Sequence, residues 1–304
     1  MTLPIATRST ACSSTNDYDR RLKRPFMPVR ATPAYCDIHK PDLQTGRIRY
    51  MNRNTSIYSG NNRVAWVTGA GSGIGRSVST LLAQNGWQVA ASSRSLDNLD
   101  SLRTQNEDHS VISIPLDVTD ACATHKAVNQ IENDIGGIEL AILNAGTFQK
   151  TPLSDFSASD MKKIFDVNVF GVANGIQSLL SKSEKLKKIV VMGSLAGYRG
   201  LPKAASYSAS KAALINFVEA IRPEAAKRGV DIFIINPGFV RTRLTPTDLP
   251  PILGISPERA AKYILAGIES GEFEIAFPKS FGYLMRVARQ IPDDLYYKIC
   301  RRIV

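Results

Sequence analysis

Seven short apolar runs alternate with stretches of helical periodicity between residues 64 and 277, and this alternation is the strongest constraint on the fold. Each run is apolar on both faces, as expected for a strand of a parallel sheet that helices cover on both sides. Repeated strand–helix units therefore predict an α/β fold with a doubly wound parallel sheet. The predicted strands are 64–68, 88–92, 111–115, 139–143, 188–192, 230–235 and 273–277.

The chain divides into one predicted domain and two flanking segments. No internal repeat and no second apolar core is visible, so we predict a single Rossmann-like domain over residues 61–278. Residues 1–60 are rich in Ser, Thr, Arg, Pro and Asn and are predicted to be a poorly ordered basic extension. Met51 leaves open where translation starts. Residues 279–304 have apolar side chains at helical spacing, which predicts a basic amphipathic helical extension.

The charge distribution argues against a nucleic-acid partner, although the formal net charge is +11. The N-terminal extension carries ten Lys and Arg against four Asp and Glu, and the C-terminal segment carries six against two. The predicted domain is thus almost neutral and has no basic face to offer. Four widely spaced cysteines without a C-x-x-C pair predict no metal site and no disulfide framework, and they fit a reducing compartment.

Targeting and membrane signals are weak. No run approaches the roughly 20 apolar residues that a spanning helix needs, and no secretory signal is visible, so we expect a soluble, cytoplasmic protein. Mitochondrial targeting by residues 1–50 is the less favoured alternative, because Asp17 and Asp19 interrupt the stretch. The C-terminal segment leaves two interpretations open, which are peripheral contact with an anionic bilayer or packing on its own domain.

A glycine-rich stretch, TGAGSGIG, lies between the first predicted strand and a helix predicted from about Ile74 to Asn85. Glycines at such a turn let the backbone approach a pyrophosphate, and the helix N-terminus offers N–H groups and the positive end of its dipole. The spacing is T-G-x-x-x-G-x-G and not the fingerprint G-x-G-x-x-G. The predicted cofactor-binding residues of this turn are Thr68, Gly69, Gly71, Ser72, Gly73, Ile74 and Gly75.

The end of the second predicted strand indicates which cofactor is preferred. An acid at this place would accept hydrogen bonds from the two hydroxyls of an adenosine ribose. Here Ser93 takes that place and Arg94 follows, so a 2′-phosphate would meet a hydroxyl and a cation. We therefore expect NADP(H) to be favoured over NAD(H). The alternative is that Arg94 is an ordinary solvated arginine.

Residues 207–211, YSASK, begin another predicted helix and suggest acid–base chemistry. Four residues apart, Tyr207 and Lys211 lie on one helix face, so an ammonium would stand beside a phenol with an ordinary pKa of about 10. We expect this charge to lower the pKa of Tyr207, which would suit an alcohol–ketone couple. Ser194 follows the strand 188–192, at the carboxyl end where ligands bind in open α/β sheets.

In this order, T-G-x-x-x-G-x-G, N-A-G, a strand-end Ser and Y-x-x-x-K resemble the short-chain dehydrogenase/reductase family, over about residues 62–278. The resemblance implies an oxidoreductase that interconverts a ketone or aldehyde with an alcohol. Tyr207 would exchange the proton, Ser194 would bind the carbonyl oxygen, and Lys211 would tune Tyr207 and hold the nicotinamide ribose. Asn168 would support a proton-relay water, unless it only bonds local backbone. The predicted catalytic residues are thus Asn168, Ser194, Tyr207 and Lys211.

The resemblance also assigns further contacts with the cofactor. Leu143 departs from the pattern, because the family commonly has a second Asn at this position. By position, Asp117, Asn144 and Gly146 would contact the adenosine. Val240 and Thr242 would bind the nicotinamide carboxamide. Besides Tyr207 and Lys211, these predicted residues are Asp117, Val118, Asn144, Ala145, Gly146, Pro237, Gly238, Val240 and Thr242.

The substrate side is predicted to be apolar, with the Pro-rich stretch 245–257 as a mobile lid. This favours a medium-sized hydrophobic ketone or alcohol, and the resemblance implies a homodimer or homotetramer. A protein that binds NADP(H) without turnover, as a sensor or scaffold, is the alternative from another class. The predicted substrate contacts are Phe148, Leu195, Tyr198 and Phe239, together with Leu201 and Leu244.

Overall fold

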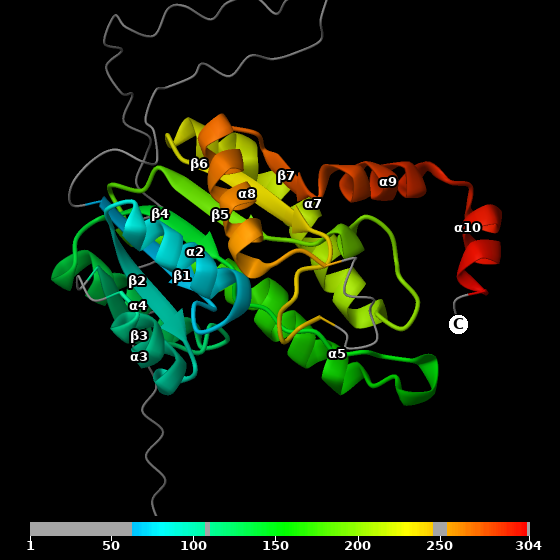
Figure 1. The fold of residues 1–304 in the computed structure, drawn as a ribbon, viewed down its shortest axis with the longest axis horizontal. Coiled ribbons are helices and arrows are strands. Elements are labelled where there is room, and N and C mark those ends of the chain that lie inside the picture. Colours follow the sequence, from blue (N-terminus) through cyan, green and yellow to red (C-terminus); the bar gives the residue numbers. More distant parts are fainter. Residues whose placement is uncertain (1–62, 107–109, 246–253, 303–304) are drawn as a thin grey trace, which may run out of the picture. The chain divides into compact units, whose positions relative to one another are not determined.

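A computed structural model describes residues 63–106, 110–245 and 254–302 (Figure 1). Within them one parallel sheet has the strand order β3-β2-β1-β4-β5-β6-β7. The seven predicted strands are confirmed, with ends that differ by at most two residues. They are β1 (Arg63–Thr68), β2 (Trp87–Ser93), β3 (Val111–Pro115), β4 (Ile138–Leu143), β5 (Lys188–Met192), β6 (Asp231–Pro237) and β7 (Glu274–Phe277).

Helices follow most of the strands and cover the sheet on both sides (Figure 1). A π-helical turn, Asp166–Phe170, joins two of them, and short 3-10 turns occur at Leu153–Asp155 and Leu195–Gly197. The α-helices are α2 (Gly73–Gln84), α3 (Leu96–Thr104), α4 (Ala121–Asp134), α5 (Ala158–Phe165), α6 (Gly171–Lys182), α7 (Ala205–Lys227), α8 (Pro257–Ser270), α9 (Lys279–Gln290) and α10 (Asp293–Cys300).

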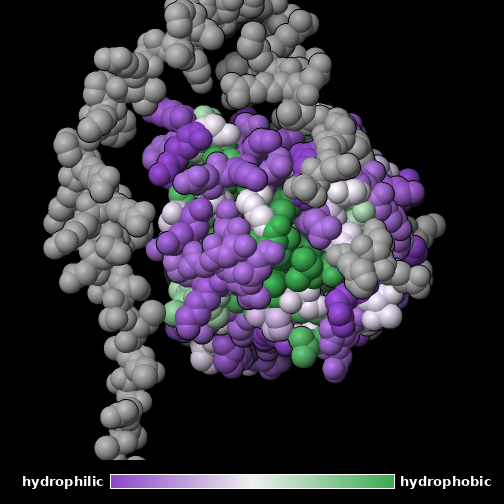
Figure 2. Space-filling model, turned by 90° about the vertical axis from the view of Figure 1, so that its left-hand side faces the viewer, coloured by the Kyte–Doolittle hydropathy of each residue, from purple (hydrophilic) through white to green (hydrophobic). Residues whose placement is uncertain are grey.

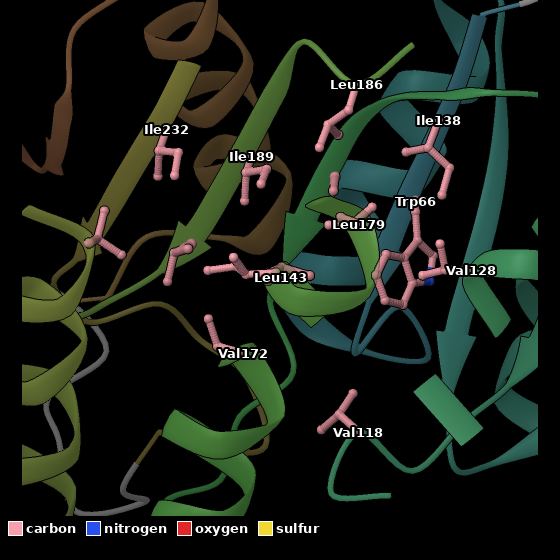
Figure 3. Close-up of a cluster of buried hydrophobic side chains, with 14 of the residues drawn as sticks. Trp66, Val118, Val128, Ile138, Leu143, Val172, Leu179, Leu186, Ile189 and Ile232 are labelled. Carbon is pink, nitrogen blue, oxygen red and sulfur yellow. The ribbon is translucent and has the colours of Figure 1, made fainter. Parts of the chain in front are cut away.

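Two buried clusters, one on each face of the sheet, confirm the doubly wound, Rossmann-like architecture. Alternate strand residues point to opposite faces, so Val67 belongs to one cluster and Trp66 to the other. The first cluster packs beneath α2, α3 and α8, and the second beneath α4, α6 and α7. Figure 3 shows part of the second core, where Trp66 lies among side chains of β4, β5, α4 and α6.

The surface and the ends of the chain bear on several predictions. On the face shown in Figure 2, hydrophilic side chains surround a small hydrophobic area. The described residues belong to one compact unit, which includes the C-terminal helices. In the described part of the chain, no helix is both long and apolar enough to cross a membrane. The predicted extension 1–60, the targeting alternative for residues 1–50 and the start at Met51 lie outside the described residues.

Candidate active site

A cavity of about 980 Å³ opens at the carboxyl ends of the central strands, where the strand order reverses between β1 and β4. Ligands of open α/β sheets bind at such a switch point. The cavity brings together most of the residues predicted from the sequence. Those lining it are Gly69, Gly71, Ser72, Gly73, Ile74, Ser93, Arg94, Asp117, Val118, Asn144, Ala145, Gly146, Phe148, Ser194, Leu195, Leu201, Tyr207, Lys211, Pro237, Gly238, Phe239, Val240, Thr242 and Leu244.

Four predicted residues do not line the cavity: Thr68, Gly75, Asn168 and Tyr198. The first three lie behind residues that do. Tyr198 instead donates its hydroxyl hydrogen to the Glu274 carboxylate at the start of β7, so its expected contact with substrate is wrong. Residues 246–253 of the predicted lid lie outside the described residues.

The glycine-rich turn has a backbone that only glycine adopts easily. Gly69 and Gly73 have φ angles of +66° and +54°, in the left-handed region. A Cβ atom on Gly71 would lie 2.8 Å from the Ser93 hydroxyl oxygen. Helix α2 begins at Gly73, and the side chain of its N-cap, Ser72, makes no capping hydrogen bond. The first N–H groups of α2 are therefore available to an anion at the cavity.

Asn144 and Thr68 fasten this turn to the end of β4. The Asn144 side-chain amide donates hydrogen bonds to the carbonyl oxygens of Thr68 (3.1 Å) and Gly69 (3.2 Å). The Thr68 hydroxyl accepts from the backbone N–H groups of Asn144 (3.0 Å) and Ala145 (3.1 Å). These two side chains thus shape the cradle from behind, and the Asn144 amide is already engaged with protein.

The far end of the cavity carries a cation beyond β2. Arg94 is exposed and lines the cavity, whereas Arg76 donates from its guanidinium to the Asn98 carbonyl oxygen (3.0 Å) and other groups of α3. Asp117 accepts hydrogen bonds from the Thr119 N–H (3.0 Å) and hydroxyl (2.8 Å). The backbone hydrogen bond from Thr119, with a smaller contribution from Arg94, holds the pKa of Asp117 below its ordinary value.

Three of the predicted catalytic side chains meet at the opposite wall. Tyr207 lies in the first turn of α7, and the Lys211 ammonium lies 5.7 Å from the centre of the Tyr207 ring. Lys211 is buried and donates a hydrogen bond to the Met192 carbonyl oxygen at 2.7 Å. Ser194 follows β5, and its N–H donates to the side-chain oxygen of Asn236 at 3.0 Å.

The electrostatics of this wall correct one expectation. Burial raises the pKa of Tyr207 above its ordinary value, and a hydrogen bond from Ser194 opposes the shift without reversing it. Burial also lowers the pKa of Lys211, to about 8. The expected lowering of the Tyr207 pKa is therefore wrong in direction, because desolvation disfavours a phenolate more than the neighbouring groups favour it.

The shifted pKa of Lys211 predicts a pH-dependent stability. Between about pH 8 and 10.5 the folded protein has lost this proton and the unfolded chain keeps it, so the free energy of unfolding rises with pH. From about pH 7.5 to about pH 9.5 we expect the wild type to gain about 2 kcal/mol relative to Lys211→Met. Urea unfolding at both pH values measures this difference. Lys262→Met, at an exposed lysine, serves as the control. The prediction would be contradicted if the free energies of unfolding of the wild type and Lys211→Met differed by the same amount at both pH values.

Asn168 acts through protein contacts in this structure. It is fully buried in the π-helical turn, and its side-chain oxygen accepts from the Thr147 N–H at 2.7 Å. Its amide donates to the Thr147 carbonyl oxygen and to the Ser210 hydroxyl, both at 3.0 Å. The side chain of Asn168 therefore bonds backbone groups, as the alternative interpretation expected, although its partner Thr147 is 21 residues away in the sequence. Asn168 positions Thr147, which lines the cavity.

Sequence reasoning missed several residues of the site, among them two on α9 and one on β6. Phe281 and Met285 of α9 line the cavity, and the Phe281 ring centre lies 5.7 Å from that of Phe239. Their spacing of four residues marked one helix face, but nothing in the sequence indicated what that face would cover. Asn236 is fully buried and holds the Ser194 backbone, while its amide donates to Glu274 at 2.6 Å.

Comparisons with known sequences agree with this arrangement. A family model described as short chain dehydrogenase matches residues 63–250. An uncharacterized oxidoreductase of Myxococcus xanthus is 35% identical over 246 residues, which cover 79% of this chain and 97% of that protein. An uncharacterized oxidoreductase of Staphylococcus aureus is 30% identical over 191 residues, which cover 62% and 83%.

Solved structures share the fold. A short chain dehydrogenase from Burkholderia cenocepacia in complex with NADP aligns with a TM-score of 0.68 and 25% identity, over 79% of this chain and 98% of that chain. A short chain dehydrogenase/reductase from Burkholderia phymatum in complex with NAD aligns with a TM-score of 0.69 and 22% identity, over 76% and 94%. At this identity the second alignment shows the fold alone.

Proposed function

Because this chain belongs to the short-chain dehydrogenase family of oxidoreductases, we propose that it is an NADP(H)-dependent carbonyl reductase or alcohol dehydrogenase. The observation that carries the proposal is the meeting of Ser194, Tyr207 and Lys211 on one wall of a cavity whose other end is a glycine-rich turn. A spectroscopic panel of carbonyls with NADPH, and of alcohols with NADP, tests it. Absence of turnover across both panels would refute it.

The residues of the cavity fit a nicotinamide dinucleotide. A Cβ atom on Gly71 or Gly73 would fill the space beside Ser93 and Thr242, so the small turn leaves room for a pyrophosphate at the N-terminus of α2. The adenosine end would lie near Arg94 and the other end near Lys211. When bound, the nicotinamide supplies or accepts the hydride. A neighbour with the same fold holds NADP and another holds NAD, which supports the cofactor class.

The protein's own part in the reaction is proton transfer and orientation. With its pKa raised, Tyr207 carries its proton at neutral pH and can donate it to a carbonyl oxygen. The Ser194 oxygen accepts from the Ala196 N–H at 3.1 Å, which fixes the hydroxyl at the wall where it can donate to the same carbonyl oxygen. Lys211, through its bond to Met192, holds the first turns of α7 at the end of β5.

The apolar side chains around the hydroxyls of Ser194 and Tyr207 support an apolar substrate of medium size. Phe148 packs edge-on against Tyr207 with 5.1 Å between ring centres, and Leu195, Phe239 and Phe281 line the same space. A hydrophobic ketone would bury its chain against them and present its oxygen to the hydroxyls. The sensor or scaffold alternative predicts retained NADPH binding with no turnover. A homodimer or homotetramer stays part of the proposal.

Cofactor preference gives a prediction that concerns Arg94. We expect Arg94→Ala to weaken NADPH binding by about 10- to 100-fold, because a charge-assisted hydrogen bond contributes about 1.5–3 kcal/mol. NADH affinity should change by no more than a few-fold. Fluorescence titration of both cofactors measures the dissociation constants, with the exposed Arg103→Ala as the control. Equal affinity of the wild type for NADH and NADPH would contradict the assignment.

A further inference from the structure

Exposed hydrophobic side chains are concentrated on the two C-terminal helices. The described residues expose twelve large hydrophobic side chains, and six of them lie within residues 283–299. Exposed groups of this density on two short helices mark an interaction surface. The six are Tyr283, Leu284 and Val287 of α9, and Leu295, Tyr297 and Ile299 of α10.

The protein's own domain cannot cover these side chains, because other faces of the helices already pack against it. Phe281 and Met285 of α9 line the cavity wall, whereas Leu284 and Val287 of the same helix are 58% and 45% exposed. On α10, Tyr296 faces inward and donates its hydroxyl hydrogen to the Gly200 carbonyl oxygen at 2.7 Å. Figure 1 shows α9 and α10 extending away from the sheet.

Arg199 fixes the two helices at their junction. Its guanidinium donates to the carbonyl oxygens of Arg289 (3.0 Å) and Ile291 (2.8 Å) at the end of α9. It also donates to the Asp293 carboxylate at 2.6 Å and lies 4.2 Å from the centre of the Tyr296 ring. A second anchor is the ion pair between Arg286 and Glu274 at 2.7 Å. The exposed side chains are therefore presented on anchored helices.

The charges of this surface indicate which class of partner it binds. Exposed cations stand between the apolar side chains, whereas Asp293 is bound to Arg199 and leaves Asp294 as the other acid of α10. A two-fold contact with a second copy would bring like charges together. An anionic bilayer attracts Lys and Arg side chains near its surface, and accepts tyrosines and aliphatic side chains at its interface. The cations are Lys279, Arg289, Lys298, Arg301 and Arg302.

We propose that the α9–α10 surface, made of these six apolar side chains and five cations, docks the protein reversibly on an anionic lipid bilayer. The helices would lie on the bilayer with their apolar side chains at the level of the headgroups. Because the inner face of α9 supplies Phe281 and Met285 to the cavity, docking brings the substrate wall close to the lipid. That last step rests on the proposed function, whereas lipid binding does not.

Flotation of the full chain with vesicles tests the proposal. We expect the wild type to float with vesicles of phosphatidylcholine and phosphatidylserine. The bound fraction should be at least about tenfold lower with vesicles of phosphatidylcholine alone, or at high salt. Leu284→Glu with Val287→Glu, and separately Lys298→Glu with Arg302→Glu, should each lower the bound fraction at least about tenfold. Leu153→Glu, at a leucine that is 91% exposed outside this surface, should float as the wild type does.

Circular dichroism and thermal unfolding of every variant show that it is folded. The proposal is overturned if the wild type stays unbound, or if both double variants float as well as the wild type. It is equally overturned if the Leu284→Glu/Val287→Glu variant changes from dimer to monomer in light scattering without lipid, because the surface would then join two copies. None of these measurements requires turnover, so an inactive wild type would refute the proposed function and leave the docking proposal to its own result.

Discussion

Tyr207→Phe is expected to lower carbonyl reduction by about 10²- to 10⁴-fold, the range that a positioned general acid contributes. The substitution removes only the hydroxyl, and the ring keeps its edge-on contact with Phe148. Lys211 keeps its own hydrogen bond to Met192, so the wall should retain its shape. NADPH affinity should therefore stay within a few-fold of the wild type, and the loss should appear in kcat.

Absorbance at the NADPH band during turnover of the best substrate of the carbonyl panel measures this loss. Ser194→Ala is the companion variant, because it removes a hydrogen-bond donor from the carbonyl oxygen but leaves the proton donor in place. Ser194→Ala should lower the rate of carbonyl reduction less than Tyr207→Phe does. A Tyr207→Phe enzyme with more than a tenth of wild-type activity would show that another group supplies the proton.

The fold could be predicted from the sequence because its strands are apolar on both faces. Runs such as Ile189–Met192 have no polar side, so a two-sided cover of helices was the consistent solution. Placement of the site followed from the same pattern. Residues that end parallel strands meet at one edge of the sheet, which is why Ser194 and the glycine-rich turn share a cavity although more than 100 residues separate them.

What could not be predicted depends on the packing of segments outside this repeating pattern. Tyr198 lies in a loop, and its partner Glu274 comes from β7, so its direction depended on the position of an edge strand. The contribution of α9 to the cavity wall depended on the turn after that strand. The direction of the Tyr207 pKa shift was missed for a related reason, since residue spacing gives the distance to Lys211 but not the depth of burial.

A Gly75→Ala substitution is expected to weaken NADPH binding by about 10- to 100-fold, although Gly75 does not line the cavity. An added Cβ would lie 2.3 Å from the Gly69 carbonyl oxygen and 2.5 Å from the Asn144 side-chain nitrogen. Overpacking of this kind costs about 1–3 kcal/mol, and the turn must open to relieve it. Opening would move Gly69, and with it the backbone that faces the pyrophosphate in the proposed complex.

A second substitution separates the two contacts. Asn144→Ala removes the side-chain contact at 2.5 Å but leaves the Gly69 carbonyl oxygen at 2.3 Å in place, so Gly75→Ala should weaken NADPH binding about as much in the Asn144→Ala background as in the wild type. Gly200→Ala is the matched control, because an added Cβ there meets no heavy atom within 4 Å. Fluorescence titration gives the affinities and thermal unfolding shows that each variant is folded. Wild-type affinity in a folded Gly75→Ala protein would mean that the cofactor does not rest on this turn.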